Sequence, residues 1–113
     1  MADIRQIRKA LVTRVLEGDG KASHTQRRAA FNNKGLAEPL RTLINKVANQ
    51  PTQITDDDIT MAKVSGVSED QIFELVICAA IGESTRQYES ALKALAEATM
   101  DKEGNKYASQ HPQ

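Results

Sequence analysis

The chain has 113 residues, of which 40% are hydrophobic and 27% charged, and its formal net charge is zero. These values are typical of one globular domain with a modest core, and no apolar run reaches the ~18–20 residues that cross a bilayer. The single cysteine, Cys78, excludes an intramolecular disulfide, and the N-terminus has no signal-peptide core, so we expect a cytoplasmic protein.

Three helices are predicted in the first 50 residues, over 3–17, 24–31 and 39–49. Asp3 and Ser23 are suitable N-caps for the first two, because their side-chain oxygens can accept a hydrogen bond from a backbone N–H of the first turn. Apolar residues recur at spacings of three and four in the first and third of these segments. Pro51 closes the third helix.

A two-helix unit folded about Gly66 is the best-specified element of the sequence. Thr55-Asp56-Asp57-Asp58 reads as a capping box that opens the first helix of the unit, with its three acids favourably placed on the helix dipole. Gly66 is suited to the left-handed position just after that helix. Ser68-Glu69-Asp70-Gln71 is a second capping box, which opens the next helix.

The last predicted helix extends from Ile72 to about Ala98. Its first ten residues contain one polar side chain, a pattern that predicts burial on most sides. Residues 101–113 have no apolar stripe and are predicted to form a flexible tail, so the domain covers residues 1–100. Because no alternating strand pattern occurs, the predicted fold is all-α, with about five helices.

The one polar residue in that buried stretch is Glu74, and an unpaired carboxylate is expensive to bury. At about 100° per residue, Glu74, Cys78 and Tyr88 fall close to one face of the helix, with Arg86 nearby. These four residues are the candidate ligand-binding site. We favour the alternative that Glu74 is structural and pairs with a basic side chain of the first half, such as Arg41 or Lys46.

Other constellations do not predict chemistry. Cys78 has no histidine near it in sequence and is expected to be an ordinary buried residue. Asp56, Asp57 and Asp58 point in three directions from a helix, so we expect no metal, and no motif indicates a cofactor or a self-contained catalytic set. Gly82, in the middle of a helix, predicts close approach of another helix, possibly from a symmetry mate.

The segment after the first capping box contains Ala62-x-x-x-Gly66-Val67-Ser68-Glu69-Asp70-Gln71-Ile72-x-Glu74-Leu75-Val76, and Cys78-Ala79-Ala80-x-Gly82 follows it. This pattern resembles the carboxymuconolactone decarboxylase and alkylhydroperoxidase-like (AhpD-like) family, in which a Ser-Glu cap after an Ala-x-x-x-Gly turn opens a long buried helix. The resemblance covers about residues 36–96, and its specific part lies near 55–82. It implies an all-helical homo-oligomer of the bacterial cytoplasm.

The sequence departs from this family where the redox chemistry would lie. The peroxidase members carry Cys-x-x-Cys and then a His four residues after the second Cys, on the helix that enters the turn. Counted back from Gly66, the His position falls on Asp58 and the two Cys positions on Ile54 and Pro51. Peroxidase and disulfide-reductase activity are therefore not implied, and no residue matches the site of the decarboxylase members.

Three hypotheses about function remain. We favour a non-redox AhpD-like protein without enzymatic activity, a homo-oligomeric scaffold that binds a partner or ligand. The second hypothesis is a decarboxylase-type enzyme with an interface pocket near Glu74 for a small carboxylic acid. The third is a nucleic-acid-binding protein, because residues 1–50 carry +6 and residues 51–113 carry −6. We favour packing of the two halves on each other as the reason for that asymmetry, so nucleic acid is not the expected partner.

Overall fold

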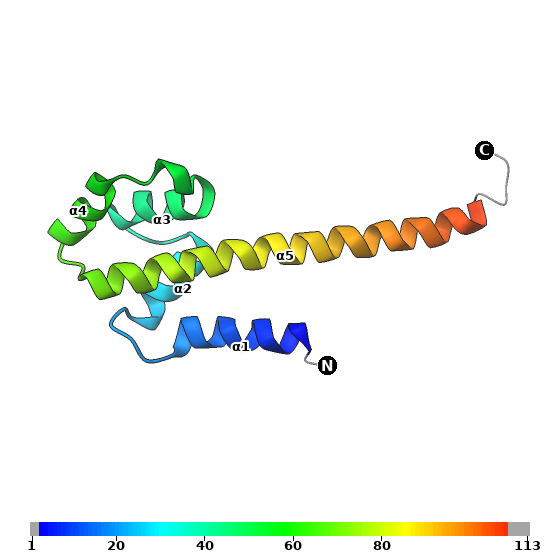
Figure 1. Ribbon diagram of the computed structural model, residues 1–113, viewed down its shortest axis with the longest axis horizontal. Helices are drawn as coiled ribbons and strands as arrows, with labels where there is room; N and C mark the ends of the chain where they lie inside the picture. The colour runs from blue at the N-terminus through cyan, green and yellow to red at the C-terminus, as the bar shows by residue number, and fades with distance from the viewer. Residues whose placement is uncertain (1–2, 109–113) are drawn as a thin grey trace. The chain divides into compact units, whose positions relative to one another are not determined.

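The computed structural model of the chain describes residues 3–108, with side chains as far as Met100. Within this range there are five α-helices, one short 3-10 helix and no strand, which confirms the predicted all-α fold. In chain order (Figure 1) they are α1 (Ile4–Glu17), α2 (His24–Asn32), α3 (Leu40–Asn49), η1 (Pro51–Gln53), α4 (Asp56–Val64) and α5 (Glu69–Ala108). None of the described helices is long and apolar enough to cross a membrane.

The chain divides into two units, one up to Glu83 and one from Ser84 onward. The first contains α1 to α4 and the beginning of α5, and the second contains the rest of α5. The backbone of α5 continues to Ala108, beyond the end predicted near Ala98, since no proline occurs before Pro112 to stop it. Of the predicted flexible tail, residues 109–113 lie outside the described residues.

Each predicted N-cap forms the expected hydrogen bond. The side chain of Asp3 accepts from the backbone N–H of Arg5 at 2.9 Å, and Ser23 Oγ accepts from Gln26 N at 3.1 Å. These bonds satisfy first-turn N–H groups that have no partner inside the helix. The first two helices therefore begin where local sequence predicts.

The unit about Gly66 has the predicted geometry in detail. Gly66 has a φ of +102°, its N–H donates to Lys63 O at 3.0 Å, and Val67 N donates to Ala62 O at 3.3 Å. This pair of bonds is a Schellman motif, which ends α4. Ser68 and Gln71 then cap α5 reciprocally, with Gln71 N donating to Ser68 Oγ at 3.2 Å and Ser68 N to Gln71 Oε1 at 2.9 Å.

The core of the first unit is centred on α3 and the beginning of α5, and the α1–α2 loop, α2 and α4 each add a buried alanine to it. Its largest fully buried side chains are Leu43, Ile44, Leu75 and Cys78. Burial in this part of α5 is restricted to one face, because Phe73 is 66% exposed although it lies inside the apolar run. An apolar run predicts that a helix packs, but it does not say how many sides are covered.

Gly82 is the point at which α5 meets the backbone of α2. A methyl group placed on Gly82 would lie 2.0 Å from the carbonyl oxygen of Phe31. The predicted close approach of a second helix is confirmed, and the approaching helix belongs to the same chain, so no symmetry mate is needed to explain the glycine.

Candidate functional site

The Glu74 carboxylate binds the loop between α1 and α2, residues 18–23. The backbone N–H of Lys21 donates to both carboxylate oxygens, at 2.7 and 2.9 Å, and the N–H of Ala22 donates at 2.8 Å. Hydrogen bonds to a charged acceptor are stronger than neutral ones. Glu74 thus satisfies two backbone groups that no helix satisfies, and it fixes the path of the α1–α2 loop.

Arg27 binds the carbonyl groups of the same loop. Its side chain is buried, with 4% exposed, and its Nε donates to Ala22 O at 3.0 Å while Nη1 donates to Gly18 O. Together Arg27 and Glu74 hold the loop through its C=O and N–H groups respectively. Gly20 has no space for a side chain beside them, since a methyl group there would lie 2.0 Å from Glu74 Oε1.

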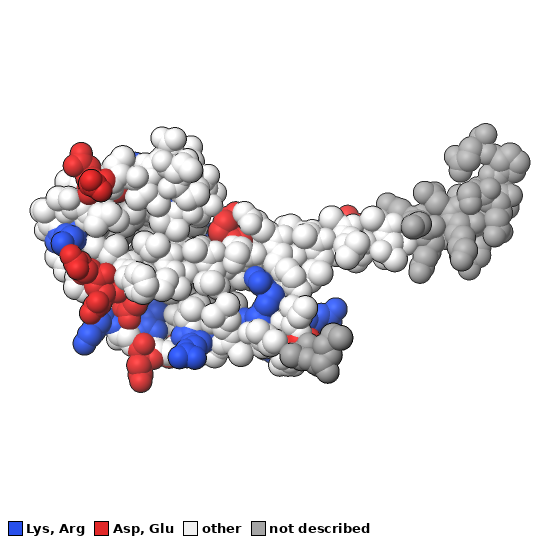
Figure 2. All heavy atoms as spheres, in the orientation of Figure 1, with Lys and Arg blue, Asp and Glu red and all other residues white. Residues whose placement is uncertain are grey.

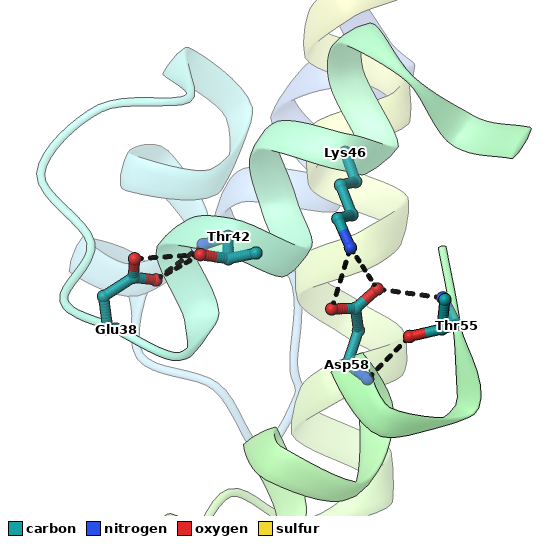
Figure 3. Close-up of polar contacts among 5 residues, drawn as sticks. All are labelled: Glu38, Thr42, Lys46, Thr55 and Asp58. Carbon is teal, nitrogen blue, oxygen red and sulfur yellow. Dashed lines mark hydrogen bonds and ion pairs between the residues drawn. The ribbon is translucent and has the colours of Figure 1, made fainter. Parts of the chain in front are cut away.

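The predicted pairing of Glu74 with Arg41 or Lys46 is wrong. Lys46 instead binds Asp58, at 2.8 Å, and Arg41 lies 3.4 Å from Glu38 (Figure 3 shows Lys46, Asp58 and Glu38). Glu38 also accepts hydrogen bonds from the N–H and hydroxyl groups of Thr42. Both bases lie on α3, where a neighbouring carboxylate is nearer than Glu74.

A cavity of about 470 Å³ lies in the first unit, beside the side chains of Glu74 and Arg27 that hold the α1–α2 loop. Its lining combines an apolar side with several charged groups, and it consists of Leu11, Arg14, Val15, Gly18, Asp19, Arg27, Glu74, Ile77 and Cys78. The volume is within the range of small-molecule sites, which are mostly apolar with a few fixed polar groups. Two of the four predicted site residues, Glu74 and Cys78, therefore lie in one cavity wall.

The other two predicted residues, Arg86 and Tyr88, belong to the second unit and are not part of this lining. The proposal that all four residues form one site stays a prediction. Sequence reasoning missed Arg27 and Arg14, which supply positive charge to the cavity. Neither arginine belongs to a motif that indicates a binding site. The folding of the α1–α2 loop over α5 brings both arginines near Glu74.

Cys78 has the environment of a structural thiol. It is 1% exposed, and its Sγ–H donates to the backbone carbonyl of Val15 at 3.3 Å. Burial raises the pKa of the thiol, an effect to which the nearby Glu74 carboxylate adds and which the Arg27 charge opposes. Because the thiolate is the nucleophilic form, this environment favours an inert residue.

The acidic run at the start of α4 is used for local structure. Asp58 accepts a hydrogen bond from Thr55 N at 2.8 Å while Thr55 Oγ1 accepts one from Asp58 N, and these two bonds form the capping box (Figure 3). The Asp58 carboxylate also forms an ion pair with Lys46. The hydrogen bond from Lys46 and that from Thr55 N lower the pKa of Asp58. Among the residues whose side chains are described, no three His, Cys, Asp or Glu groups are placed to hold a metal ion.

Basic residues of the first half are partly committed to contacts within the chain. Arg27 holds the α1–α2 loop, and three others form ion pairs: Arg28 with Glu17, Arg41 with Glu38, and Lys46 with Asp58. Figure 2 shows acidic side chains gathered over α4 and the beginning of α5, with basic side chains nearer α1. Of these three pairs, only Lys46–Asp58 joins residues 1–50 to residues 51–113, so packing of the two halves on each other stays a prediction for the remaining charges.

Several large apolar side chains remain on the surface. The most exposed in the first unit are Val64 (76%), Phe73 (66%), Ile4 (61%), Ile7 (55%) and Met61 (55%). Helix α1 has no buried residue at all among its 14 positions. Single exposed apolar residues are ordinary, but Ile4, Ile7 and Leu11 lie in one row on α1, and a row of this kind indicates a surface that another molecule covers.

Comparisons with protein-family models, with curated protein sequences and with solved structures find no match to this chain. The family resemblance of the segment around Gly66 therefore stays a prediction.

Proposed function

We propose that the protein is a cytoplasmic, non-redox AhpD-like scaffold that acts as a homo-oligomer and binds its partners through helix surfaces. The observation that carries this proposal is the exposed stripe of α1. Ile4, Ile7 and Leu11 are 61%, 55% and 41% exposed, so these three side chains of the stripe are not covered within the described chain, whereas Val15, at its far end, packs against the core. Covering such side chains contributes roughly 25 cal/mol per Å² of apolar surface, which is the main driving force of association.

The hydrogen bonds that Glu74 and Arg27 form within the first unit support the same proposal. Glu74 accepts hydrogen bonds from two backbone N–H groups, and Arg27 donates to two carbonyls. Groups used in this way hold a loop in place, and a bound substrate would have to compete with that loop for them. The buried thiol of Cys78 is protonated at neutral pH, since its pKa is raised.

Light scattering coupled to size-exclusion chromatography tests the proposal. We expect a mass that is a multiple of the 12.4 kDa chain. Replacing Ile7 with Lys should lower that mass or weaken capture of a partner, while the control Thr13→Lys, on the opposite side of α1, should not. A wild-type protein that stays monomeric at every concentration refutes the homo-oligomer.

A second candidate function is binding of a small carboxylic acid, as in the decarboxylase-type hypothesis. The observation that favours it is the cavity of about 470 Å³ in which Arg14 and Arg27 accompany apolar side chains. Arg14 is exposed, and among the described residues its side chain forms no hydrogen bond that the substitution would remove. Arg14→Gln should therefore abolish binding of a carboxylate such as benzoate, measured by calorimetry, without changing the melting temperature. Equal binding by both proteins excludes this candidate.

A further inference from the structure

An apolar groove lies between α4 and the beginning of α5, in the first unit. Its volume is about 250 Å³, and its lining consists of Ile59, Glu69, Ile72, Phe73 and Val76. Phe73 is 66% exposed, so the groove is open to other molecules. Small-molecule sites usually have roughly 300–1,000 Å³, whereas pockets in protein interfaces receive single side chains of a partner. The α4–α5 groove therefore has the size and the lining of a docking surface for side chains of another protein chain.

Uncompensated carboxylates lie on both sides of the groove. Asp56 on α4 and Asp70 on α5 each lie one turn before a groove residue of the same helix, and therefore on the same side of that helix. Both are exposed, and neither forms an ion pair with a residue whose side chain is described. Glu69, in the lining, is neutralised by Lys63 at 2.6 Å. The groove thus combines an apolar floor with net negative charge, and Figure 2 shows acidic side chains over this part of the molecule.

Helix α1 has the complementary surface. Its row of Ile4, Ile7 and Leu11 is exposed, and Arg14 lies one turn after Leu11 and lines the same cavity wall, so this arginine lies beside the row. Arg5 adds a second positive charge, next to Ile4 in sequence. Both arginines are exposed, and neither forms an ion pair with a residue whose side chain is described. An uncovered apolar row with positive charge therefore matches an uncovered apolar groove with negative charge.

The groove and α1 of one chain lie on different sides of α5. The cavity beside α1 and the groove beside α4 have no lining residue in common, although both use the first part of α5. At about 100° per residue, Glu74 and Cys78 lie on one side of this helix, and Ile72 and Val76 lie on roughly the opposite side. Glu74 also binds the loop at the end of α1, which keeps α1 on its own side. The α1 row can therefore enter the groove of a second copy but not that of its own chain.

We propose that α1 of one copy of this chain docks in the α4–α5 groove of a second copy. This inference rests on the homo-oligomer proposed above, and it names the surface that covers the α1 row. At the contact, the uncompensated arginines of α1 meet the uncompensated carboxylates of the groove. Because two different surfaces meet, a pair of copies keeps one free α1 and one free groove, and association continues to a closed ring or a longer chain.

Two single substitutions test which surfaces meet. Ile7→Lys places a charge in the α1 row and Phe73→Lys places one at the groove, both at exposed positions where the fold should be kept, which circular dichroism verifies. We expect each variant to raise the dissociation constant at least about tenfold in sedimentation equilibrium, and the exposed controls Thr13→Lys and Ser90→Lys to associate like wild type. A homo-oligomer that survives either Ile7→Lys or Phe73→Lys refutes the docking but not the homo-oligomer. A monomeric wild type refutes both.

A mixture of the two variants tests the head-to-tail arrangement. The Phe73→Lys chain keeps its α1 row and the Ile7→Lys chain keeps its groove, so the two proteins together can form one native contact and no second one. We expect two monomeric proteins to give, when mixed, a dimer of twice 12.4 kDa that contains one chain of each kind. A mixture that remains monomeric refutes the proposed contact.

The salt dependence of association tests the charge complementarity. Since salt screens attraction between exposed charges, the dissociation constant of the wild type should rise as sodium chloride is added. Asp70→Asn should reduce this dependence, and the control Asp57→Asn, on a side of α4 away from the groove, should not. A wild-type dissociation constant that does not change with salt refutes the selection of α1 by charge.

Discussion

The carboxylate of Glu74 accepts a hydrogen bond of 2.8 Å from the backbone N–H of Ala22, a residue 52 positions earlier in the chain. A second N–H, from Lys21, binds the same carboxylate. These hydrogen bonds explain why a carboxylate occurs at position 74, inside an otherwise apolar part of α5. They fix the α1–α2 loop on α5, close to the end of α1.

Glu74→Gln should destabilise the protein by roughly 1–3 kcal/mol, because an amide can accept from the loop with its oxygen only and loses the charge. Thermal or urea unfolding followed by circular dichroism measures this loss. Glu89→Gln, at an exposed position of α5, is the control and should stay within about 0.5 kcal/mol of wild type. A Glu74→Gln protein as stable as wild type would show that the carboxylate does not hold the loop.

Gly82→Ala should also destabilise the protein. Alanine is favoured over glycine in a helix by about 1 kcal/mol, but the added methyl group would lie 2.0 Å from Phe31 O, and overpacking of this kind costs about 1–3 kcal/mol or more. We expect a lower melting temperature. Ser90→Ala, on an exposed side of the same helix, should leave stability unchanged or raise it slightly. A stabilised Gly82→Ala protein would mean that α2 and α5 do not approach closely.

Cys78 should not react with Ellman's reagent in the native protein, and it should react fully in guanidinium chloride. The reason is its 1% exposure together with the rise in its pKa on burial. A Ser90→Cys variant, whose added thiol is exposed, provides the positive control for native reactivity. Rapid modification of native wild-type protein would place Cys78 in an accessible site and revive a chemical role for it.

Stability should fall in acid, through carboxylates whose pKa is lower in the folded protein. The hydrogen bond from Lys46 lowers the pKa of Asp58, that from the Thr42 side chain lowers the pKa of Glu38, and that from Lys63 lowers the pKa of Glu69. Since the unfolded chain takes up protons more readily, this stabilisation is complete above the ordinary carboxyl range, roughly pH 4, and is lost as pH falls through the lower folded values.

Urea unfolding at pH 7 and pH 3 measures this dependence, and Asp58→Asn should flatten it. The control Asp57→Asn changes the neighbouring carboxylate in the same turn, which forms no ion pair with any residue whose side chain is described. A wild-type protein equally stable at both pH values would contradict the role of these carboxylates.

The elements fixed by local contacts could be predicted from sequence. The capping box of Ser68 with Gln71 and the left-handed turn at Gly66 each depend on residues within a few positions of one another, so a short pattern determines them. The same holds for the N-caps of α1 and α2. The end of α5 was less predictable, because a helix without a stop signal can continue through polar residues.

The partner of Glu74 could not be predicted, because it is a pair of backbone N–H groups in a loop far away in sequence. A search for a partner of opposite charge selects basic side chains such as Lys46. Backbone N–H donors cannot be found in this way, because nearly every residue has one. The exposure of Phe73 was missed for a related reason. Hydrophobic pattern identifies a helix that packs, but the number of neighbouring elements decides which of its faces are covered.

Sedimentation equilibrium of the wild-type protein over a hundredfold range of concentration tests the central claim, that this chain works as a homo-oligomer, most directly. The account predicts a mass of at least twice 12.4 kDa at the upper concentrations, with dissociation on dilution. A constant mass of one chain over the whole range would contradict it.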